Sequence, residues 1–301
     1  MRRDWLKLLV LLLPVLTGCL SHTRRLQQPV LAGPVLNADV LDLVKGVNDR
    51  YDKIQSLTAT MDFSASVGGA HQGKQTDYTS IHGYILFRKP RMLRVLGLVP
   101  VLHTHAFDLV SNGNTFTLLI PPKDRAIAGS NSVTAAAANP LENLRPGVFV
   151  DSILIHSISP DQIVSVIHES STTLNPTMKR LVELPQYDLT VLSEADPISP
   201  VDIAKVAKPL RVIRFSRVDL LPAEQDIYNA AGDLETQVLY GPYRDFDGTK
   251  FPSTIDISRP IDGYRIRMAV EKLVVNPVNP PLTDETFEVT IPPGYKVQNL
   301  P

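Results

Sequence analysis

Leu57-Thr58-Ala59-Thr60-Met61-Asp62-Phe63-Ser64-Ala65 is the segment with the clearest signal for secondary structure. Its odd-numbered positions are apolar, and its even-numbered positions are polar or charged. Successive side chains of a β-strand point to opposite faces, so this alternation predicts a strand with one face buried and the other face wet. The sheet that contains this strand is therefore expected to cover a core with one face.

A helix is predicted directly before this strand. Apolar residues recur three or four positions apart from Val40 to Leu57, which is the spacing of a helix with one buried face. Asn37 is predicted to cap its first turn. Residues 20–36 have no periodicity and contain prolines, so they are expected to form a tether in front of the folded domain.

Further strands are predicted on both sides of a weakly helical middle. Short apolar runs bounded by turn residues predict strands at 81–88, 92–98, 105–110, 115–120, 124–128, 187–192, 210–219, 234–240, 253–258, 264–273 and 287–289. Helical segments are predicted near 140–144, 148–155 and 160–164. Hairpin-length connections favour antiparallel pairing. The predicted fold is mainly β with helices (α+β), a single curved antiparallel sheet that forms an unclosed β-barrel, with helices over its open side.

The first 18 residues predict a lipoprotein signal peptide. A basic start is followed by an apolar run that is too short to span a membrane. Leu16-Thr17-Gly18-Cys19 then resembles the bacterial lipobox, and Cys19 is the only cysteine in the chain. The predicted arrangement is a signal peptide over 1–18, a lipidated tether over 19–36 and one domain over 37–301. The alternative is an ordinary signal peptide followed by an incidental cysteine.

An acylated Cys19 would bind the chain to membrane lipid, because two or three acyl chains hold a protein firmly. In the sorting rule of enterobacteria, an aspartate after the cysteine retains a lipoprotein in the inner membrane, and here that position is Leu20. The expected location is therefore the periplasmic face of the outer membrane, with the chain anchored by lipid.

Charge and motifs exclude several classes of function. The formal net charge is −1, and residues 1–18 hold three basic and one acidic side chain, so the rest of the chain carries −3 and nucleic acid is not an expected partner. No serine nucleophile motif, phosphate loop or glycine-rich dinucleotide turn is present. His103 and His105 lack a third ligand at a recognisable spacing. We expect no enzyme activity, no catalytic residues, no cofactor and no metal.

Five segments stand in an order that resembles one protein family. They are residues 51–59 (YDKIQSLTA), 84–94 (YILFRKPRMLR), 112–121 (NGNTFTLLIP), 246–252 (FDGTKFP) and 283–287 (TDETF). Taken together over about residues 37–290, they resemble the LolA/LolB-like outer-membrane lipoprotein carriers. The resemblance implies an unclosed barrel with a helical lid and a hollow apolar interior that receives acyl chains. The segment 129–205 is longer than in that family.

Two groups of residues follow from this resemblance. The wall of the lipid-binding cavity is expected to include alternate strand residues, namely Met61, Phe63, Phe87, Leu93, Val95 and Phe116. The alternative is that these side chains fill a solid core. A membrane-insertion loop is expected at Leu98, Val99, Val101 and Leu102, where a connection is almost wholly apolar. The alternative is a strand that runs on and packs under a helix.

The function expected from these features is that of a membrane-anchored lipoprotein that binds acyl chains of lipoproteins or lipids in a hydrophobic half-barrel, in outer-membrane transport. The alternative is a structural or sensing envelope lipoprotein that uses the same fold to bind a partner protein. Arginines on two predicted strands could contact phosphate head groups or form a solvated outer face; they are Arg211, Arg214, Arg217, Arg265 and Arg267.

Overall fold

The computed structural model describes residues 24, 26, 28–69, 73–102, 104–131, 144–194 and 207–300. Cys19 and the signal peptide lie outside the described residues, as does most of the predicted helix at 140–144. The chain forms two compact units. The smaller consists of Met1–Ala32 with Ser171–Leu184, and the larger of Gly33–Ser170 with Pro185–Pro301.

The larger unit is built on one sheet, in which β2 (Ser56–Gly69) lies between β17 (Tyr264–Val275) and β4 (Ile81–Arg88). From β17 the sheet continues through β16 (Thr254–Arg259), β13 (Leu234–Tyr240), β12 (Pro222–Tyr228), β11 (Ala207–Ser216) and β10 (Arg180–Glu194). From β4 it continues through β5 (Met92–Leu98), β6 (His105–Ser111), β7 (Thr115–Ile120), β8 (Arg125–Ser130) and β18 (Lys296–Asn299).

This sheet confirms the predicted architecture with one correction. Among the described strands, those at the two ends of the order do not pair with each other, so the barrel is unclosed. Most neighbours pair antiparallel, but β18 pairs with β8 in parallel, and β1 (Val30–Leu31) pairs with β10 in parallel. The sheet is therefore mixed, because segments far apart in sequence join it at its ends.

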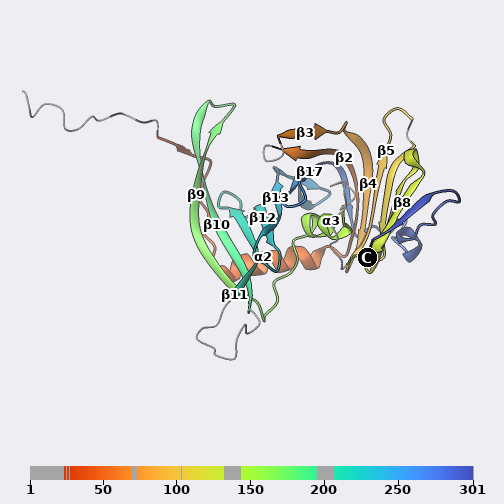
Figure 1. Cartoon of the computed structure of the whole chain (residues 1–301). Coiled ribbons are helices and arrows are strands. Elements are labelled where there is room, and N and C mark those ends of the chain that lie inside the picture. Colours follow the sequence, from red (N-terminus) through yellow and green to blue (C-terminus); the bar gives the residue numbers. More distant parts are fainter. Residues whose placement is uncertain are drawn as a thin grey trace, which may run out of the picture. The chain divides into compact units, whose positions relative to one another are not determined.

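The alternation that predicted β2 is confirmed by its burial. Leu57, Ala59, Met61 and Phe63 are all buried, and their neighbours in sequence are less so. Their face of the sheet, called here the inner face, packs on α3 (Pro146–Ile153), which falls within the predicted helical middle. Figure 1 shows the strands from β17 to β8 curving around α3. The core of this half-barrel thus includes a helix on its concave side.

The N-terminal helix α2 (Val40–Lys53) is confirmed, but its predicted cap is wrong. Asp39 caps the helix, because its carboxylate accepts a hydrogen bond from the Asp42 backbone N–H at 2.8 Å, and the Asp42 side chain accepts one from the Asp39 N–H at 3.2 Å. Leu43 and Val47 pack on β10 and β11 in a second core cluster. This helix therefore covers a different part of the sheet from α3.

Several predicted elements are wrong or were missed. Residues 160–164 are not helical, since β9 (Ile163–Asn175) begins there and pairs with β10. Residues 287–289 are not a strand, because a 3-10 helix η4 (Asp284–Phe287) buries Phe287 instead. Most of the missed strands are short or largely exposed, namely β1, β3 (Lys74–Asp77), β9, β14 (Tyr243–Phe246), β15 (Thr249–Pro252) and β18. β12 was also missed, and it buries the polar side chains of Gln225 and Asp226.

Candidate functional site

An apolar cavity of about 470 Å³ opens on the inner face of the half-barrel. Four aromatic rings line it, from Phe63 on β2, Tyr78 after β3, Phe107 on β6 and Phe149 on α3. The other lining residues are mostly aliphatic or small: Ser64, Ala65, Thr79, Ile81, Ala106, Leu118, Ile120, Lys123, Leu144 and Ile266. A concave site with this lining suits a ligand whose main part is hydrocarbon.

Strand register explains why these residues meet at one end of the sheet. Phe63 of β2 faces Ile81, the first residue of β4, and Phe107 of β6 faces Gly97 near the end of β5. The β5–β6 connection leaves the sheet at this same end, because β5 ends at Leu98 and β6 begins at His105. The cavity and the apolar connection therefore share one rim.

Two glycines leave room on the inner face beside the cavity. Gly83 of β4 pairs directly with Gly97 of β5. A Cβ at position 97 would lie 2.4 Å from Cε1 of Phe107 and 2.7 Å from Cδ1 of Ile81. A Cβ at position 83 would lie 2.0 Å from the backbone oxygen of Leu96. Glycine here permits close approach of the cavity-lining side chains and of the backbone.

The six residues predicted to form the cavity wall are all buried on the inner face. Phe63 lines the cavity. The other five belong with Phe63 to the core cluster that includes α3, and they are Met61, Phe87, Leu93, Val95 and Phe116. In this conformation their side chains contact protein, as the solid-core alternative expects. Their contact with an acyl chain stays a prediction.

The predicted membrane-insertion loop is exposed at its centre. Leu98 ends β5 and is half-buried, as is Val99, whose N–H donates to the Thr104 carbonyl at 2.7 Å. Val101 and Leu102 are 89% and 71% exposed, so these two residues do not pack under a helix. Val101 also has a φ of 69°, which is unfavourable for a β-branched side chain. Figure 1 shows the β5–β6 connection projecting beyond the sheet.

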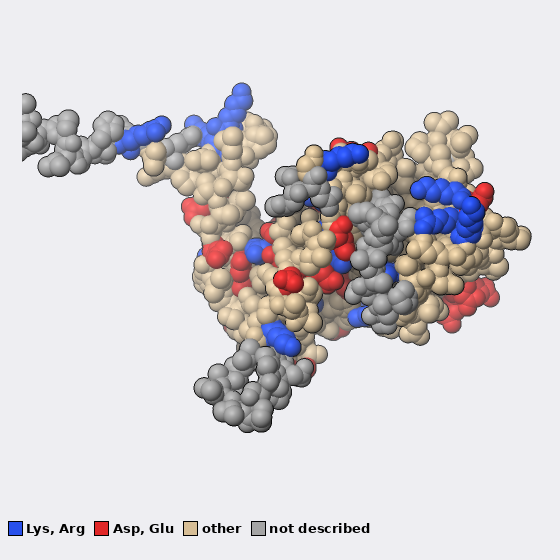
Figure 2. All heavy atoms as spheres, viewed as in Figure 1, with Lys and Arg blue, Asp and Glu red and all other residues tan. Residues whose placement is uncertain are grey.

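Basic groups stand on the same rim. Lys123 ends the 3-10 helix η2 (Pro121–Lys123), and it is the one charged side chain among the described residues that line the cavity. Arg125 and Lys296 face each other across the β8–β18 pairing that follows. Figure 2 shows basic side chains gathered over β8 and β18. An amphiphile with an anionic head group would find its counter-charge at the mouth of the cavity.

Most residues that line the cavity were not predicted from the sequence. Phe107 and Leu118 carried a signal, since they lie in predicted strands. Leu144 and Phe149 come from the middle segment and enter the cavity only through the position of α3. Lys123 follows two prolines in a predicted turn, and nothing local distinguishes it from a solvated lysine.

A larger hollow of about 660 Å³ differs in its lining. Its lining includes Ser64, Ser66, Asp256, Arg265 and Arg267, most of which alternate with the buried residues of β2, β16 and β17. Charged and hydroxyl groups of this kind suit water and ions. The smaller apolar cavity is therefore the better candidate for a hydrocarbon ligand.

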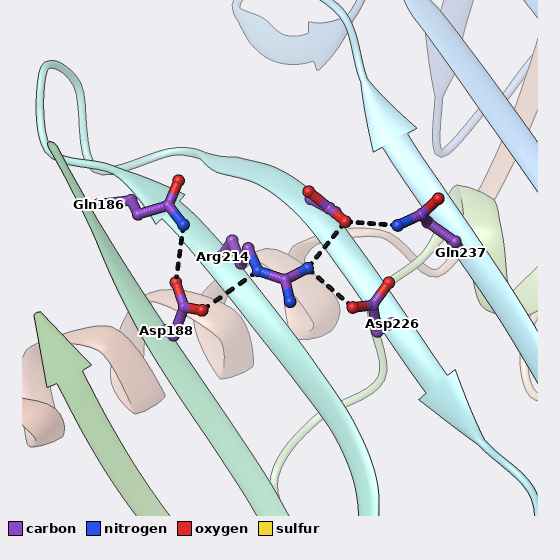
Figure 3. A network of polar contacts seen from close by, with 6 residues as sticks. Gln186, Asp188, Arg214, Asp226 and Gln237 are labelled. Atoms are coloured by element: carbon purple, nitrogen blue, oxygen red, sulfur yellow. Dashed lines mark hydrogen bonds and ion pairs between the residues drawn. The ribbon is translucent and has the colours of Figure 1, made fainter. Parts of the chain in front are cut away.

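Two of the arginines considered as head-group ligands, Arg211 and Arg214, have partners within the protein. Arg214 of β11 donates to Asp188 at 3.1 Å and to Asp226 at 2.8 Å, and it lies 2.7 Å from Glu224 (Figure 3). Arg211 donates to the Ser157 carbonyl at 3.0 Å. The head-group hypothesis is wrong for Arg214, because three carboxylates already surround its guanidinium.

Burial sets the protonation of this network. Burial raises the pKa of Asp188 above its ordinary value, against the opposing effect of Arg214. Burial likewise raises the pKa of Glu224, again against Arg214. For Arg214 burial acts to lower the pKa, but the hydrogen bond to Asp226 and the neighbouring carboxylates outweigh it, so the pKa is raised. The arginine is therefore a fixed cation beside two carboxyl groups, those of Asp188 and Glu224, whose pKa values are raised.

Among the residues that the structure describes, one group of side chains could hold a metal ion. Asp62 of β2, His82 of β4 and Glu271 of β17 each offer a ligand atom, and these atoms lie within 4.8 Å of one another. His82 Nδ1 is 3.1 Å from Asp62 Oδ1 and 3.8 Å from Glu271 Oε2. The three residues come from three strands, so no sequence spacing indicates the group. Of the histidine pair in the sequence, His103 lies outside the described residues.

Within the described ranges, no helix is both long and apolar enough to cross a membrane.

The fold is an unclosed β-barrel with a helix on its concave side, which is the fold expected from the resemblance in sequence. Compared with protein-family models, the chain matches none. Compared with curated proteins, it also matches none.

Several solved structures are similar in fold. A LolA superfamily protein from Nitrosomonas europaea is 11% identical, with a TM-score of 0.45 over 82% of this chain and 97% of that chain. A DUF1329 family protein from Desulfovibrio piger is 14% identical, with a TM-score of 0.47 over 82% and 95%. A domain described as an outer membrane lipoprotein-sorting protein, from Vibrio parahaemolyticus, is 12% identical, with a TM-score of 0.46 over 82% and 95%.

Proposed function

We propose that this chain is a lipid-anchored envelope lipoprotein that binds acyl chains of lipoproteins or lipids in its apolar cavity, in outer-membrane lipoprotein or lipid transport. The observation that carries the proposal is the shared rim of the cavity and the exposed Val101 and Leu102. A carrier needs both a protected site for hydrocarbon and a surface that enters the membrane where the hydrocarbon is exchanged.

The energetics of binding follow from the lining of the cavity. Removing apolar surface from water is favourable by about 25 cal/mol per Å², so an acyl chain needs few polar contacts to bind. The aromatic rings of Phe63, Phe107 and Phe149 supply a wall from three different elements. Binding and release of the chain require no bond to be made or broken, and the proposed function is therefore not enzymatic.

The anchor is the second part of the proposal. Cys19, acylated after removal of residues 1–18, would hold the chain on the periplasmic face of the outer membrane. The tether that follows would then keep the half-barrel within reach of the bilayer. Acylation of this kind would be checked by mass spectrometry of the N-terminal peptide, in which Cys19→Ser should lack the lipid mass.

Native mass spectrometry with lipid extraction tests the binding itself. Residues 19–301 with Cys19→Ser, secreted behind an ordinary cleavable signal peptide and purified from a bacterial periplasm without detergent, should retain acyl species at near-equal stoichiometry. A protein that is free of lipid, and that also fails to take up a fluorescent fatty acid, would favour the structural or sensing alternative.

A further inference from the structure

The smaller unit joins the tether to the turn of a long hairpin. Val30 of β1 faces Val182 of β10, Leu31 faces Glu183, and the Ala32 N–H donates to the Glu183 carbonyl at 3.1 Å. The tether is thus held beside the β9–β10 turn, whose residues 171–184 belong to the same compact unit. Whatever surface the tether approaches, this turn approaches with it.

Basic residues outnumber acidic residues in the segments 20–32 and 171–184 of this unit. Residues 20–32 contain Arg24 and Arg25 and no acidic residue. Residues 171–184 contain Lys179 and Arg180, with Glu183 as their one acidic residue. The three basic residues whose structure is described, Arg24, Lys179 and Arg180, are all exposed. Figure 2 shows basic side chains at the end of this hairpin. The rest of the chain does not share this excess, because the formal charge of the whole chain is −1.

Large apolar side chains of the same segments are also exposed to solvent. Leu174 and Met178 at the turn are 61% and 66% exposed, and Leu26 on the tether is 77% exposed. Val30 and Leu31 are each about half exposed. Exposed apolar groups among Lys and Arg, with Glu183 as the one acidic residue of 171–184, are the composition of surfaces that lie in the head-group region of a bilayer.

The turn holds its side chains in a defined arrangement. The Asn175 side-chain oxygen accepts hydrogen bonds from the backbone N–H of Thr177 at 3.0 Å and of Met178 at 2.9 Å. Lys179 completes the turn with a φ of 51°. These bonds fix the backbone between Leu174 and Arg180, so the apolar and basic groups of the turn are presented together before any partner binds.

From these observations we propose that the smaller unit is a membrane-binding surface that recognises anionic phospholipid, separate from the cavity. Phosphate groups would pair with Arg24, Lys179 and Arg180, while Leu174 and Met178 enter the boundary between head groups and acyl chains. This inference goes beyond acyl-chain binding and does not depend on it. It concerns a second attachment, additional to the lipid on Cys19, that fixes how the chain stands on the bilayer.

Vesicle co-sedimentation tests this surface without the covalent lipid. The mature chain, residues 19–301 with Cys19→Ser, is mixed with vesicles of phosphatidylcholine alone or with an equal part of phosphatidylglycerol. It should bind the anionic vesicles, and salt should weaken that binding. Adding Lys179→Glu and Arg180→Glu should lower the binding about tenfold or more, since each basic residue near an anionic bilayer contributes to affinity. Leu174→Ser with Met178→Ser should also lower it.

A matched pair of charge reversals serves as the control. Arg91→Glu, in the β4–β5 turn, with Lys250→Glu, on β15, makes the same change in charge at exposed positions of the larger unit and should leave vesicle binding unchanged. Ala106→Trp, which fills the apolar cavity, should leave it unchanged too, so failure here is distinguishable from failure of the proposed carrier function. Equal binding to neutral and anionic vesicles, no binding to either, or full binding by the Lys179→Glu, Arg180→Glu variant would each overturn the proposal.

Discussion

Gly83 and Gly97 face each other on β4 and β5, and together they remove two side chains from the inner face of the half-barrel next to the cavity. The two positions differ in what surrounds them. At Gly97 the nearest atoms belong to the rings and methyl groups that line the cavity, whereas at Gly83 the nearest atom is a backbone oxygen of the facing strand.

This difference predicts separable effects of two alanine substitutions. Gly97→Ala should displace Phe107 toward the cavity, reduce acyl-chain uptake and lower the free energy of unfolding by about 1–3 kcal/mol. Gly83→Ala should cost more stability, because the backbone of β5 must move. Urea unfolding and fluorescent fatty-acid titration of both variants measure this. A Gly97→Ala protein with parental uptake and stability would show that Phe107 has room to move elsewhere.

Lys123 should discriminate between head groups. Replacing it with glutamate exchanges an attraction of up to about 1 kcal/mol at an exposed site for a repulsion of similar size. Roughly tenfold weaker binding of a fatty-acid anion is expected, since about 1.4 kcal/mol corresponds to tenfold. Binding of the matching long-chain alcohol, which has no charge, should not change. Lys250→Glu is the control, and equal losses for both ligands would exclude Lys123 as the head-group partner.

The β5–β6 loop should act in delivery and not in binding. Val101→Glu with Leu102→Glu places two charges where apolar side chains would enter the membrane, so transfer of a fluorescent fatty acid from protein to vesicles should slow about tenfold or more. Uptake by the cavity should persist. Val278→Glu, at a side chain that is 78% exposed outside this loop, should leave transfer at the parental rate. Unchanged transfer in the loop variant would favour the structural or sensing function.

The Arg214 network should make stability depend on pH in a defined direction. Because the pKa values of Asp188 and Glu224 are raised in the folded chain, protonation stabilises the fold as the pH falls through those values. Arg214→Gln leaves three carboxylates without their cation, which should cost about 3–5 kcal/mol at neutral pH. The loss should shrink at mildly acidic pH. Urea unfolding at both pH values measures it, and a loss independent of pH would mean that packing dominates.

Secondary-structure elements were predicted correctly where the pattern of neighbouring residues determines them. The alternation from Leu57 to Ala65 and the helical spacing from Val40 depend on near neighbours, and both elements were confirmed. β9 was missed because most of its residues are exposed, so no alternation of burial marks it. Phe287 reads as the start of a strand because it is apolar, yet it is buried by a single 3-10 turn.

In the candidate site too, residues that meet only through the tertiary fold were not predicted from the sequence. Phe63 was predicted from its strand, whereas Phe149 reaches the cavity only because α3 lies inside the half-barrel. Arg214 was read as an exposed base, because its three acidic partners come from β10 and β12 and meet it through strand register. Contacts of this kind depend on the tertiary fold and have no signature in adjacent residues.

Binding of an acyl chain in the apolar cavity is tested most directly by a substitution that fills the cavity. Fluorescent fatty-acid titration should compare Ala106→Trp, at a cavity-lining alanine, with Ala223→Trp, at an exposed alanine on β12 of the same sheet. The account predicts saturable one-to-one binding by the parent and by Ala223→Trp, and its loss in a folded Ala106→Trp protein. Parental affinity in Ala106→Trp, or no saturable binding by the parent, would contradict it.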